Sequence, residues 1–251
     1  MVNPLSFGVS DIDGLLGGGL LKGNSYLLET ERGTEPDAFI ASFIEGGCCH
    51  EEFCTVVSYD VGHEELIKRL TRFIDIKEKL DRGALIIIDM WAKAKNGYDP
   101  TGPILMTGKP KDINTVAKLS YELIEQVPKR MQNGNFRGMR VVTYSLLSMI
   151  TNYKFGPTYR WTKSGLGLTR QANVTALTIL DPTVFDGITV AAFEHLNDGI
   201  IILSMKELAA KNQRYIRIKQ SPMSGFSTRV VPYDIADKKP RLLMKPEQFG
   251  A

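Results

Sequence analysis

The sequence has little of what marks membrane, secreted or disulfide-rich proteins. It contains three cysteines in 251 residues, and no apolar run approaches the ~20 residues that a membrane-spanning helix needs. Its first residues, MVNPLSFGVSD, lack both the basic segment and the apolar stretch of an export signal. We therefore expect a cytoplasmic protein that has no membrane partner.

An excess of charge of one sign is also missing. The net charge is +3, and lysines and arginines are interspersed with acidic residues instead of forming a block. This distribution argues against non-specific binding of nucleic acid by the bulk surface. The hydrophobic fraction of 43% and the charged fraction of 24% are those of an ordinary globular protein, and the length suits one large α/β domain.

The three cysteines lie close together in the segment CCHxxxC, as Cys48, Cys49 and Cys54, with His50 among them. This spacing lacks the paired C-x-x-C pattern of a structural zinc site, and no second cluster of cysteines and histidines completes it. We therefore expect buried or partly exposed free thiols at a helix-to-strand connection, in preference to metal binding or redox use.

Residues 14–45 have the order of elements that surrounds a phosphate-binding loop. A glycine turn leads into a short apolar strand at residues 25–28, and a polar loop and an amphipathic helix follow. A working loop has the pattern G-x-x-x-x-G-K-[ST], whose lysine binds the β- and γ-phosphates and whose hydroxyl binds Mg²⁺. The corresponding positions here are Glu31, Arg32, Gly33, Thr34, Glu35, Pro36 and Asp37.

Glu35, Pro36 and Asp37 stand where the lysine and the hydroxyl belong. The two carboxylates would repel a triphosphate, and Pro36 removes a backbone N–H donor from the loop. The sequence therefore predicts that the frame is retained and the phosphate chemistry lost. One alternative stays open, in which the backbone N–H groups of residues 31–34 at a helix N-terminus hold a phosphate without the lysine.

Apolar strands alternate with amphipathic helices along the chain, which predicts an α/β fold with a mostly parallel sheet and helices on both faces. The expected strands cover residues 25–28, 53–59, 84–88, 140–144, 174–180 and 199–205. The expected helices cover residues 37–45, 63–74, 113–131 and 145–151. We expect Gly46 and Gly47 to stop the first of these helices.

The end of the chain follows a different pattern. Segments 215–219 and 229–233 have short connections, so we expect them to form an antiparallel C-terminal edge of the sheet. Residues 92–112 form a long connection rich in glycine, proline and lysine. The chain is expected to fold as one domain over residues 1–236, followed by a polar C-terminal tail, 237–251.

Three stretches resemble the KaiC-like branch of the RecA/RadA ATPases. FGVSDIDGLLGGGLLKGNSYLL, residues 7–28, is similar to that family's opening segment; EHLNDGIIIL, residues 194–203, is similar to its E-x-[LI]-x-D-G-[IV]-[IL]-x-L strand; and STRVVPYDI, residues 227–235, is similar to its closing strand. The resemblance covers residues 7–235. It implies a RecA-like fold whose subunits pack head to tail, with ATP and Mg²⁺ bound at the subunit boundary.

Other positions that this family uses for ATP also differ. Tyr144 takes the place of the Walker B aspartate, and a phenol is uncharged near neutral pH. In VSYDV, Asp60 and Val61 replace two adjacent acids, one of which is the family's general base. The segment RIKQSPMSG offers Lys219 but has Ser221 where the arginine of a K-x-R pair belongs. Together with the altered loop, these changes predict a pseudo-ATPase with no catalytic residue, no metal and no cofactor, unless the loop still binds ATP and Mg²⁺.

The resemblance therefore predicts a scaffold or regulatory subunit that forms homo-oligomers, or hetero-oligomers with a RecA- or KaiC-like paralogue. The alternative function is an atypical ATP-binding protein or weak ATPase of the KaiC/RadA type. Asp60 and Asp89 follow predicted parallel strands, at the sheet edge where α/β proteins bind ligands. Acids at such positions also cap helices, so both roles stay open for them.

A third hypothesis is binding of DNA or RNA through residues 153–170, where RecA-type proteins carry DNA-contacting loops. This segment mixes aromatic and basic side chains, which stack on bases and neutralise phosphates. The same residue types favour a subunit interface or internal packing, and we retain that alternative. The candidate residues are Lys154, Tyr159, Arg160, Trp161, Lys163 and Arg170.

Overall fold

The computed structural model of the chain describes residues 4–91, 102–107, 109–120, 122, 135–208 and 211–243. The strands are β1 (Ser25–Thr30), β2 (Glu52–Ser58), β3 (Leu85–Asp89), β4 (Ile104–Met106), β5 (Gly138–Tyr144), β6 (Thr175–Leu180), β7 (Gly199–Leu208), β8 (Lys211–Gln220), β9 (Val230–Ala236) and β10 (Lys239–Leu242). The helices are α1 (Ser10–Leu15), α2 (Pro36–Cys48), α3 (His63–Thr71), α4 (Ile76–Asp81), α6 (Leu146–Tyr153), α7 (Phe155–Gln171), the 3₁₀ helix η1 (Pro182–Val184) and α8 (Gly187–Leu196).

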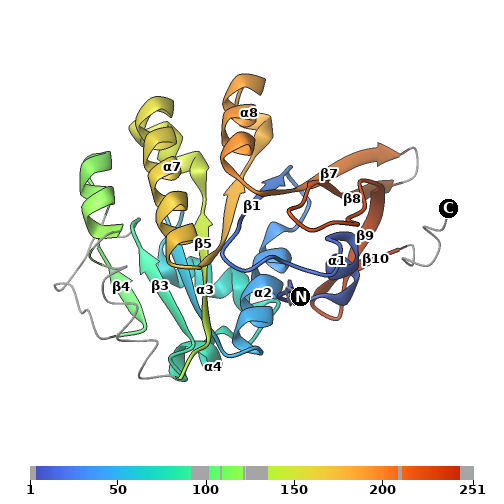
Figure 1. Cartoon of the computed structure of the whole chain (residues 1–251), viewed down its shortest axis with the longest axis horizontal. Helices are drawn as coiled ribbons and strands as arrows, with labels where there is room; N and C mark the ends of the chain where they lie inside the picture. Colours follow the sequence, from blue (N-terminus) through green and yellow to red (C-terminus); the bar gives the residue numbers. More distant parts are fainter. Residues whose placement is uncertain are drawn as a thin grey trace.

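The ten strands form one sheet in the order β10-β9-β8-β7-β1-β6-β5-β2-β3-β4. The strands from β7 to β4 in this order pair in parallel. β8, β9 and β10 extend the sheet beyond β7 by antiparallel pairing. Figure 1 shows the long β7–β8 ribbon extending away from the parallel part of the sheet. The expected fold class, including the antiparallel C-terminal edge, is confirmed.

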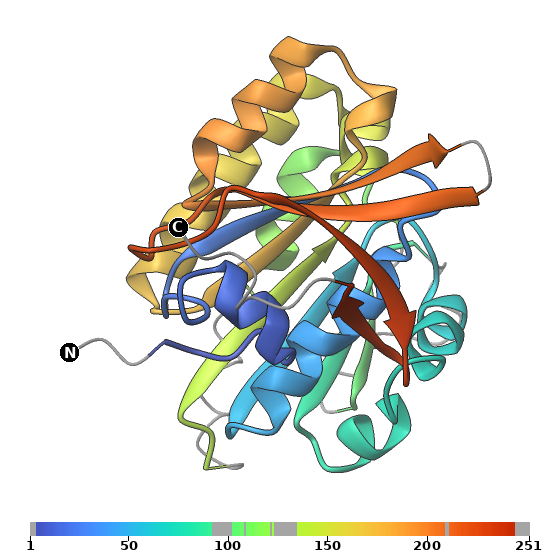
Figure 2. The same ribbon diagram turned by 90° about the vertical axis from the view of Figure 1, so that its right-hand side faces the viewer.

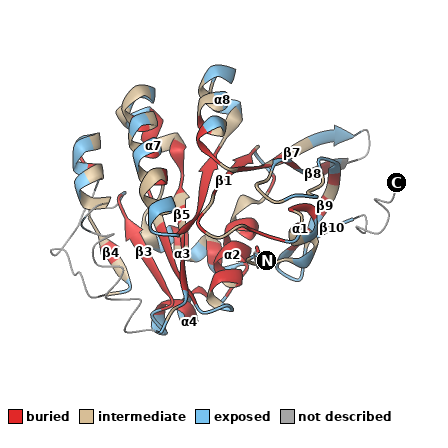
Figure 3. Cartoon of the chain, viewed as in Figure 1, coloured by how far each residue is buried: buried red, intermediate tan, exposed pale blue. Residues whose placement is uncertain are grey.

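Helices cover both faces of the parallel part. α1, α2, α3 and α4 pack on one face, and α6, α7, α8 and the helical residues 113–120 pack on the other (Figures 1 and 2). β1, β3 and β6 are therefore buried along their whole length, as Figure 3 shows, which explains their nearly continuous apolar sequences. Among the described residues, no helix is both long and apolar enough to cross a membrane.

The structure corrects the expected end of the helix at 37–45. α2 continues through Gly46 and Gly47 and ends at Cys48. Both glycines are buried, and a Cβ atom on Gly46 would lie 2.8 Å from the backbone nitrogen of Gly8. A Cβ atom on Gly47 would lie 2.7 Å from the sulfur of Cys54. The glycines therefore allow close packing against neighbouring segments instead of stopping the helix.

The C-terminal part and the long connections also differ from expectation. The segment expected as a tail from residue 237 contains β10, which pairs with β9. The expected connection 92–112 contains β4, although residues 92–101 and 108 lie outside the described residues. Of the expected helix 113–131, residues 113–120 and 122 are helical and the rest lie outside the described residues. The sequence pattern also missed α8, which lies between two expected strands.

Candidate functional site

The loop between β1 and α2 lies at the carboxyl end of β1, where a phosphate-binding loop belongs. Donors from the antiparallel strands hold its backbone carbonyl groups. Arg214 Nε of β8 donates to the carbonyl oxygen of Gly33 at 2.8 Å, and the Tyr233 hydroxyl of β9 donates to that of Thr34 at 2.6 Å. The C-terminal strands, which the sequence did not link to this loop, thus supply hydrogen-bond donors to it.

Glu31 ties the start of the loop to β7. Its carboxylate accepts a hydrogen bond from the backbone nitrogen of Met205 at 2.8 Å, and its own backbone nitrogen donates to the carbonyl of Leu203. The Thr34 hydroxyl donates to the Glu31 carbonyl at 2.6 Å. Gly33 has a φ of +84°, and a Cβ atom there would lie 2.8 Å from Met205 Cε. The loop is therefore a compact turn packed against β7.

Glu35 places a carboxylate at the N-terminus of α2. This residue has a left-handed backbone with φ of 55°, and Pro36 begins the helix. The Glu35 carboxylate lies 3.3 Å from Nη2 of Arg72, which directly follows α3, and 4.0 Å from Arg214 Nη2. Arg32 is exposed to solvent. Arg72 and Arg214, which could attract a phosphate, thus have a carboxylate of the chain itself beside them.

Tyr144, at the Walker B position, connects to the loop through Asp37. The Tyr144 hydroxyl donates to Asp37 Oδ1 at 3.0 Å, and Arg69 Nη1 donates to the Tyr144 hydroxyl oxygen at 3.1 Å. Burial raises the pKa of Asp37, although the bond from Tyr144 and the charge of Arg69 oppose the shift. Burial and the Asp37 charge raise the pKa of Tyr144 well above its ordinary value, so the phenol stays neutral.

Asp60 and Asp89 both lie where the sequence places them, at the carboxyl ends of parallel strands. Asp60 accepts hydrogen bonds from the Ser145 hydroxyl and from the backbone nitrogen of Ser148 at 3.1 Å, at the start of α6. Asp89 is fully buried and accepts bonds at 2.7 Å from both the backbone nitrogen and Nδ1 of His63, the first residue of α3. Each carboxylate thus caps a helix, and His63 is a partner that sequence spacing did not reveal.

These residues do not fit a magnesium-bound triphosphate. Phosphate binding needs N–H donors and a lysine, whereas Glu35 and Asp37 bring negative charge to the N-terminus of α2, and Pro36 has no backbone N–H to donate. The phenol of Tyr144 is a poor ligand for Mg²⁺, which prefers carboxylates. Within the described ranges, no group of three histidines, cysteines or acids is arranged to hold a metal ion.

The segment proposed for nucleic acid is helical rather than a loop, since it spans the end of α6 and most of α7. Its two aromatic candidates are half-buried and pack on neighbouring rings: Trp161 meets Tyr59 edge-to-face at 5.8 Å, and Tyr159 meets Phe193 at 6.1 Å. The basic residues Lys154, Arg160 and Lys163 are exposed. Internal packing therefore accounts for the two aromatic candidates, and nucleic-acid binding by the exposed charges stays a prediction.

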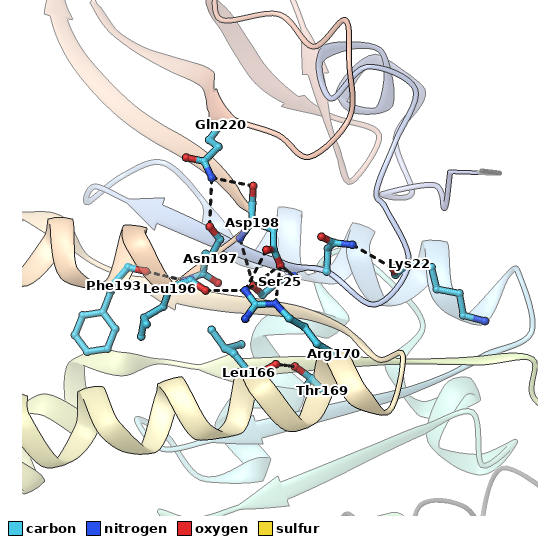
Figure 4. A network of polar contacts seen from close by, with 11 residues as sticks. Lys22, Ser25, Leu166, Thr169, Arg170, Phe193, Leu196, Asn197, Asp198 and Gln220 are labelled. Atoms are coloured by element: carbon cyan, nitrogen blue, oxygen red, sulfur yellow. Dashed lines mark hydrogen bonds and ion pairs between the residues drawn. The ribbon is translucent and has the colours of Figure 1, made fainter. Parts of the chain in front are cut away.

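Arg170, the last candidate of that segment, belongs to a polar network at the amino end of β1 (Figure 4). Its Nη2 donates to Asp198 Oδ1 and to the carbonyl of Leu196, both at 3.0 Å. Asp198 also accepts bonds from the backbone nitrogen and the hydroxyl of Ser25 at 2.8 and 2.9 Å. Arg170 thus joins the C-terminal end of α7 to the first residues of β1 and β7.

Comparisons with known proteins agree with this architecture. The circadian clock protein KaiC3 of Synechocystis sp. is 23% identical over 220 residues, covering 85% of this chain and 38% of that protein. The circadian clock oscillator protein KaiC of Prochlorococcus marinus is 21% identical over 242 residues, covering 95% of this chain and 44% of that protein. The chain thus spans less than half the length of these curated relatives.

A solved structure supports the fold. The crystal structure of a KaiC-like protein from Pyrococcus horikoshii OT3 matches with a TM-score of 0.73 and 18% identity, covering 97% of this chain and all of that one. The family model described as "ATPase: KaiC" matches residues 5–246, which include every strand of the sheet and the altered loop. The resemblance drawn from the three sequence stretches is therefore confirmed, and the chain belongs to the KaiC ATPase family.

Proposed function

We propose that this chain is a non-catalytic member of its family, which acts as a scaffold or regulatory subunit by assembling with copies of itself or with a RecA- or KaiC-like paralogue. One observation carries the proposal: the loop after β1 has carboxylates at the N-terminus of α2, where a phosphate-binding loop has a lysine and a hydroxyl. The Glu35 carboxylate lies beside Arg72, the Asp37 carboxylate accepts a hydrogen bond from Tyr144, and Arg214 and Tyr233 hold the loop through its carbonyl groups.

The physical consequence is that the loop needs no ligand to be stable. In a phosphate-binding loop the N–H groups and a lysine carry positive potential, which the bound phosphates compensate. Here the chain supplies the compensating negative groups, and the phenol of Tyr144 replaces an ion-binding carboxylate. Loss of the ligand then leaves the fold and its surfaces in place, which is what a subunit acting through association requires.

The assembly part of the proposal rests on the family. RecA-like domains pack head to tail, and such heterologous contacts close into rings or extend as filaments. A member without nucleotide chemistry can retain this packing surface. The partner is then a protein of the same fold, and the role is to complete, cap or regulate the assembly.

Isothermal titration of the chain with Mg-ATP and Mg-ADP tests the first part. We expect no saturable heat and no thermal shift at millimolar nucleotide, with Mg²⁺ alone as the blank. A saturable isotherm that requires the adenine nucleotide would contradict the proposal and favour an atypical ATP-binding protein. Phosphate release from bound ATP above the buffer rate would favour the weak ATPase.

Light scattering after size exclusion tests the second part on the same preparation. We expect particles larger than one chain, either alone or after mixing with an ATP-binding RecA-like chain, and we expect added nucleotide to leave the size of the homo-oligomer unchanged. A chain that stays a monomer alone and in every such mixture would contradict the scaffold role without affecting the titration result.

A further inference from the structure

The fold brings two of the three cysteines into contact. Cys48 is the last residue of α2 and Cys54 lies in β2, and their sulfur atoms are 3.8 Å apart. The three thiols are free, as expected from the sequence. The sequence spacing does not contain a C-x-x-C pattern, so this proximity depends on the return of the chain from α2 into the sheet.

The two thiols have different surroundings. Cys48 is half-buried, whereas Cys54 is 1% exposed. Lys79 of α4 lies near Cys48, where it forms ion pairs with Glu45 at 3.0 Å and with Glu78 at 2.7 Å. Glu45 of α2, Arg140 of β5 and Arg82, which follows α4, also act on Cys48. Cys48 is thus partly accessible to solvent, and the protein interior encloses Cys54.

This asymmetry assigns different roles to the two sulfurs. The hydrogen bond with Cys54 lowers the pKa of the Cys48 thiol, with help from Lys79 and Arg140. The same bond and burial raise the pKa of Cys54 well above its ordinary value. Burial and Glu45 raise the pKa of the neighbouring Cys49. Because the thiolate is the reactive form, Cys48 is the nucleophile of the three.

We infer that Cys48 and Cys54 form a peroxide-reactive dithiol that closes reversibly to an intramolecular disulfide. The Cys48 thiolate attacks one peroxide oxygen, the O–O bond breaks, and the leaving hydroxide takes a proton to become water. The Cys54 sulfur then attacks the resulting sulfenic acid, the S–S bond forms, and the S–O bond breaks with release of a second water molecule. Peroxide gains the two electrons that the thiols lose. A dithiol reductant then reduces the disulfide back to the two thiols and is itself oxidised.

The bond would join the end of α2 to strand β2. α2 begins at Pro36, directly after the altered loop, and Gly47 packs against Cys54 within the same contact. A disulfide needs the two sulfurs about 2.05 Å apart, so the pair must close by roughly 2 Å on oxidation. Since residue 48 is at a helix end, a rotation of its side chain and a small shift of the 49–51 connection can supply this movement.

The test is oxidation of the reduced full chain with hydrogen peroxide, followed by quenching and denaturation. We expect titratable thiols to fall from three to one, the intact mass to fall by about 2 Da, and peptide mapping to link Cys48 to Cys54. Dithiothreitol should restore all three thiols. An unchanged mass, or a link that involves Cys49, would overturn the inference.

Variants separate the roles of the sulfurs. In Cys54→Ala, dimedone should trap a sulfenic acid on Cys48, whereas Cys48→Ala should lose the mass change altogether. Cys49→Ser is the matched control and should still form the link. Circular dichroism verifies that each variant is folded. If a variant fails to fold, differential alkylation of the native wild-type chain decides: Cys48 should react at least tenfold faster than Cys49, and the reverse order would overturn the assignment.

Discussion

In α/β proteins the carboxyl end of a parallel strand usually binds a ligand, whereas the amino end does not. In this chain, contacts within the protein hold both ends of β1. At the amino end, Asp198 binds Ser25 and Arg170 in a network that joins three elements. At the carboxyl end, where a ligand normally supplies the charges, Arg214 and Tyr233 bind the loop after the strand. At both ends, hydrogen bonds to or from side chains of the chain itself hold the strand or the loop that follows it.

Under the proposed function, the carboxyl end of β1 is a former binding site that has become a structural junction. A ligand site retains donors and charges without protein partners, because the ligand completes them. The carboxyl end of β1 instead matches donors with carbonyls and arginines with carboxylates, as the amino end does. Substitutions at either end, or a change of pH that titrates the buried carboxyl group of Glu29 between them, test this comparison.

The largest effect is expected from pH, through Glu29 near the carboxyl end of β1. Burial, together with the adjacent Glu194 of α8, raises the pKa of Glu29 to about 8, although Lys219 of β8 opposes the shift. A glutamate in the unfolded chain titrates near 4.5. Between these values the folded protein binds the extra proton, so the free energy of unfolding should fall as pH rises, by up to about 1.4 kcal/mol per unit.

Urea unfolding at several pH values between 5 and 8 measures this slope. Glu29→Gln, which keeps the shape and removes the titration, should flatten it and should be the more stable protein at pH 8. An equal slope in the variant and the wild type would show that another group is responsible.

At the amino end, Asp198→Ala should lower the free energy of unfolding by about 2–3 kcal/mol, because Ser25 and the guanidinium of Arg170 lose a shared charged acceptor. Asp198→Asn retains one oxygen acceptor, so it should lower the free energy of unfolding by less than Asp198→Ala does. Denaturant titration at pH 7 compares the two. A loss below about 0.5 kcal/mol for the alanine variant would mean that this network does not hold the end of β1.

At the carboxyl end, Tyr233→Phe should lower the free energy of unfolding by about 1–2 kcal/mol, since the buried hydroxyl donates a hydrogen bond to the Thr34 carbonyl. Arg72→Gln is the matched control. The Arg72 side chain is 58% exposed, so loss of its ion pair with Glu35 should cost less than about 0.5 kcal/mol. If Tyr233→Phe lowers the free energy of unfolding no more than the control does, the hydrogen bond from Tyr233 does not stabilise the loop.

Much of the fold followed from local sequence patterns. The buried strands have continuous apolar sequences because helices cover both faces of the parallel sheet, and the final strands have short connections because they pair antiparallel. The helix end at Gly46 and Gly47 was wrong because a glycine pair also serves close packing, here against Gly8 and Cys54. Nothing local in the sequence distinguishes these two uses of glycine.

The candidate site was predictable only in part. The order of strand, loop and helix placed residues 31–37, and chemistry alone indicated that Glu35, Pro36 and Asp37 are unsuited to phosphate. The partners of the loop were not predictable, because Arg214 and Tyr233 come from strands far along the chain. For the aromatic residues of α7, the sequence left nucleic-acid contact and internal packing as alternatives, since composition does not say which way a helix faces.

The sequence by itself determined which chemical groups this protein has at each position of an ATPase frame, because side-chain identity decides charge, donors and acceptors. Only the tertiary structure decided what those groups do. It placed Arg214 on the Gly33 carbonyl, tied Tyr144 to Asp37, and brought Cys48 within 3.8 Å of Cys54. Hydrogen bonds and thiol chemistry act over a few ångströms, and the packing of helices on the sheet sets which residues come that close.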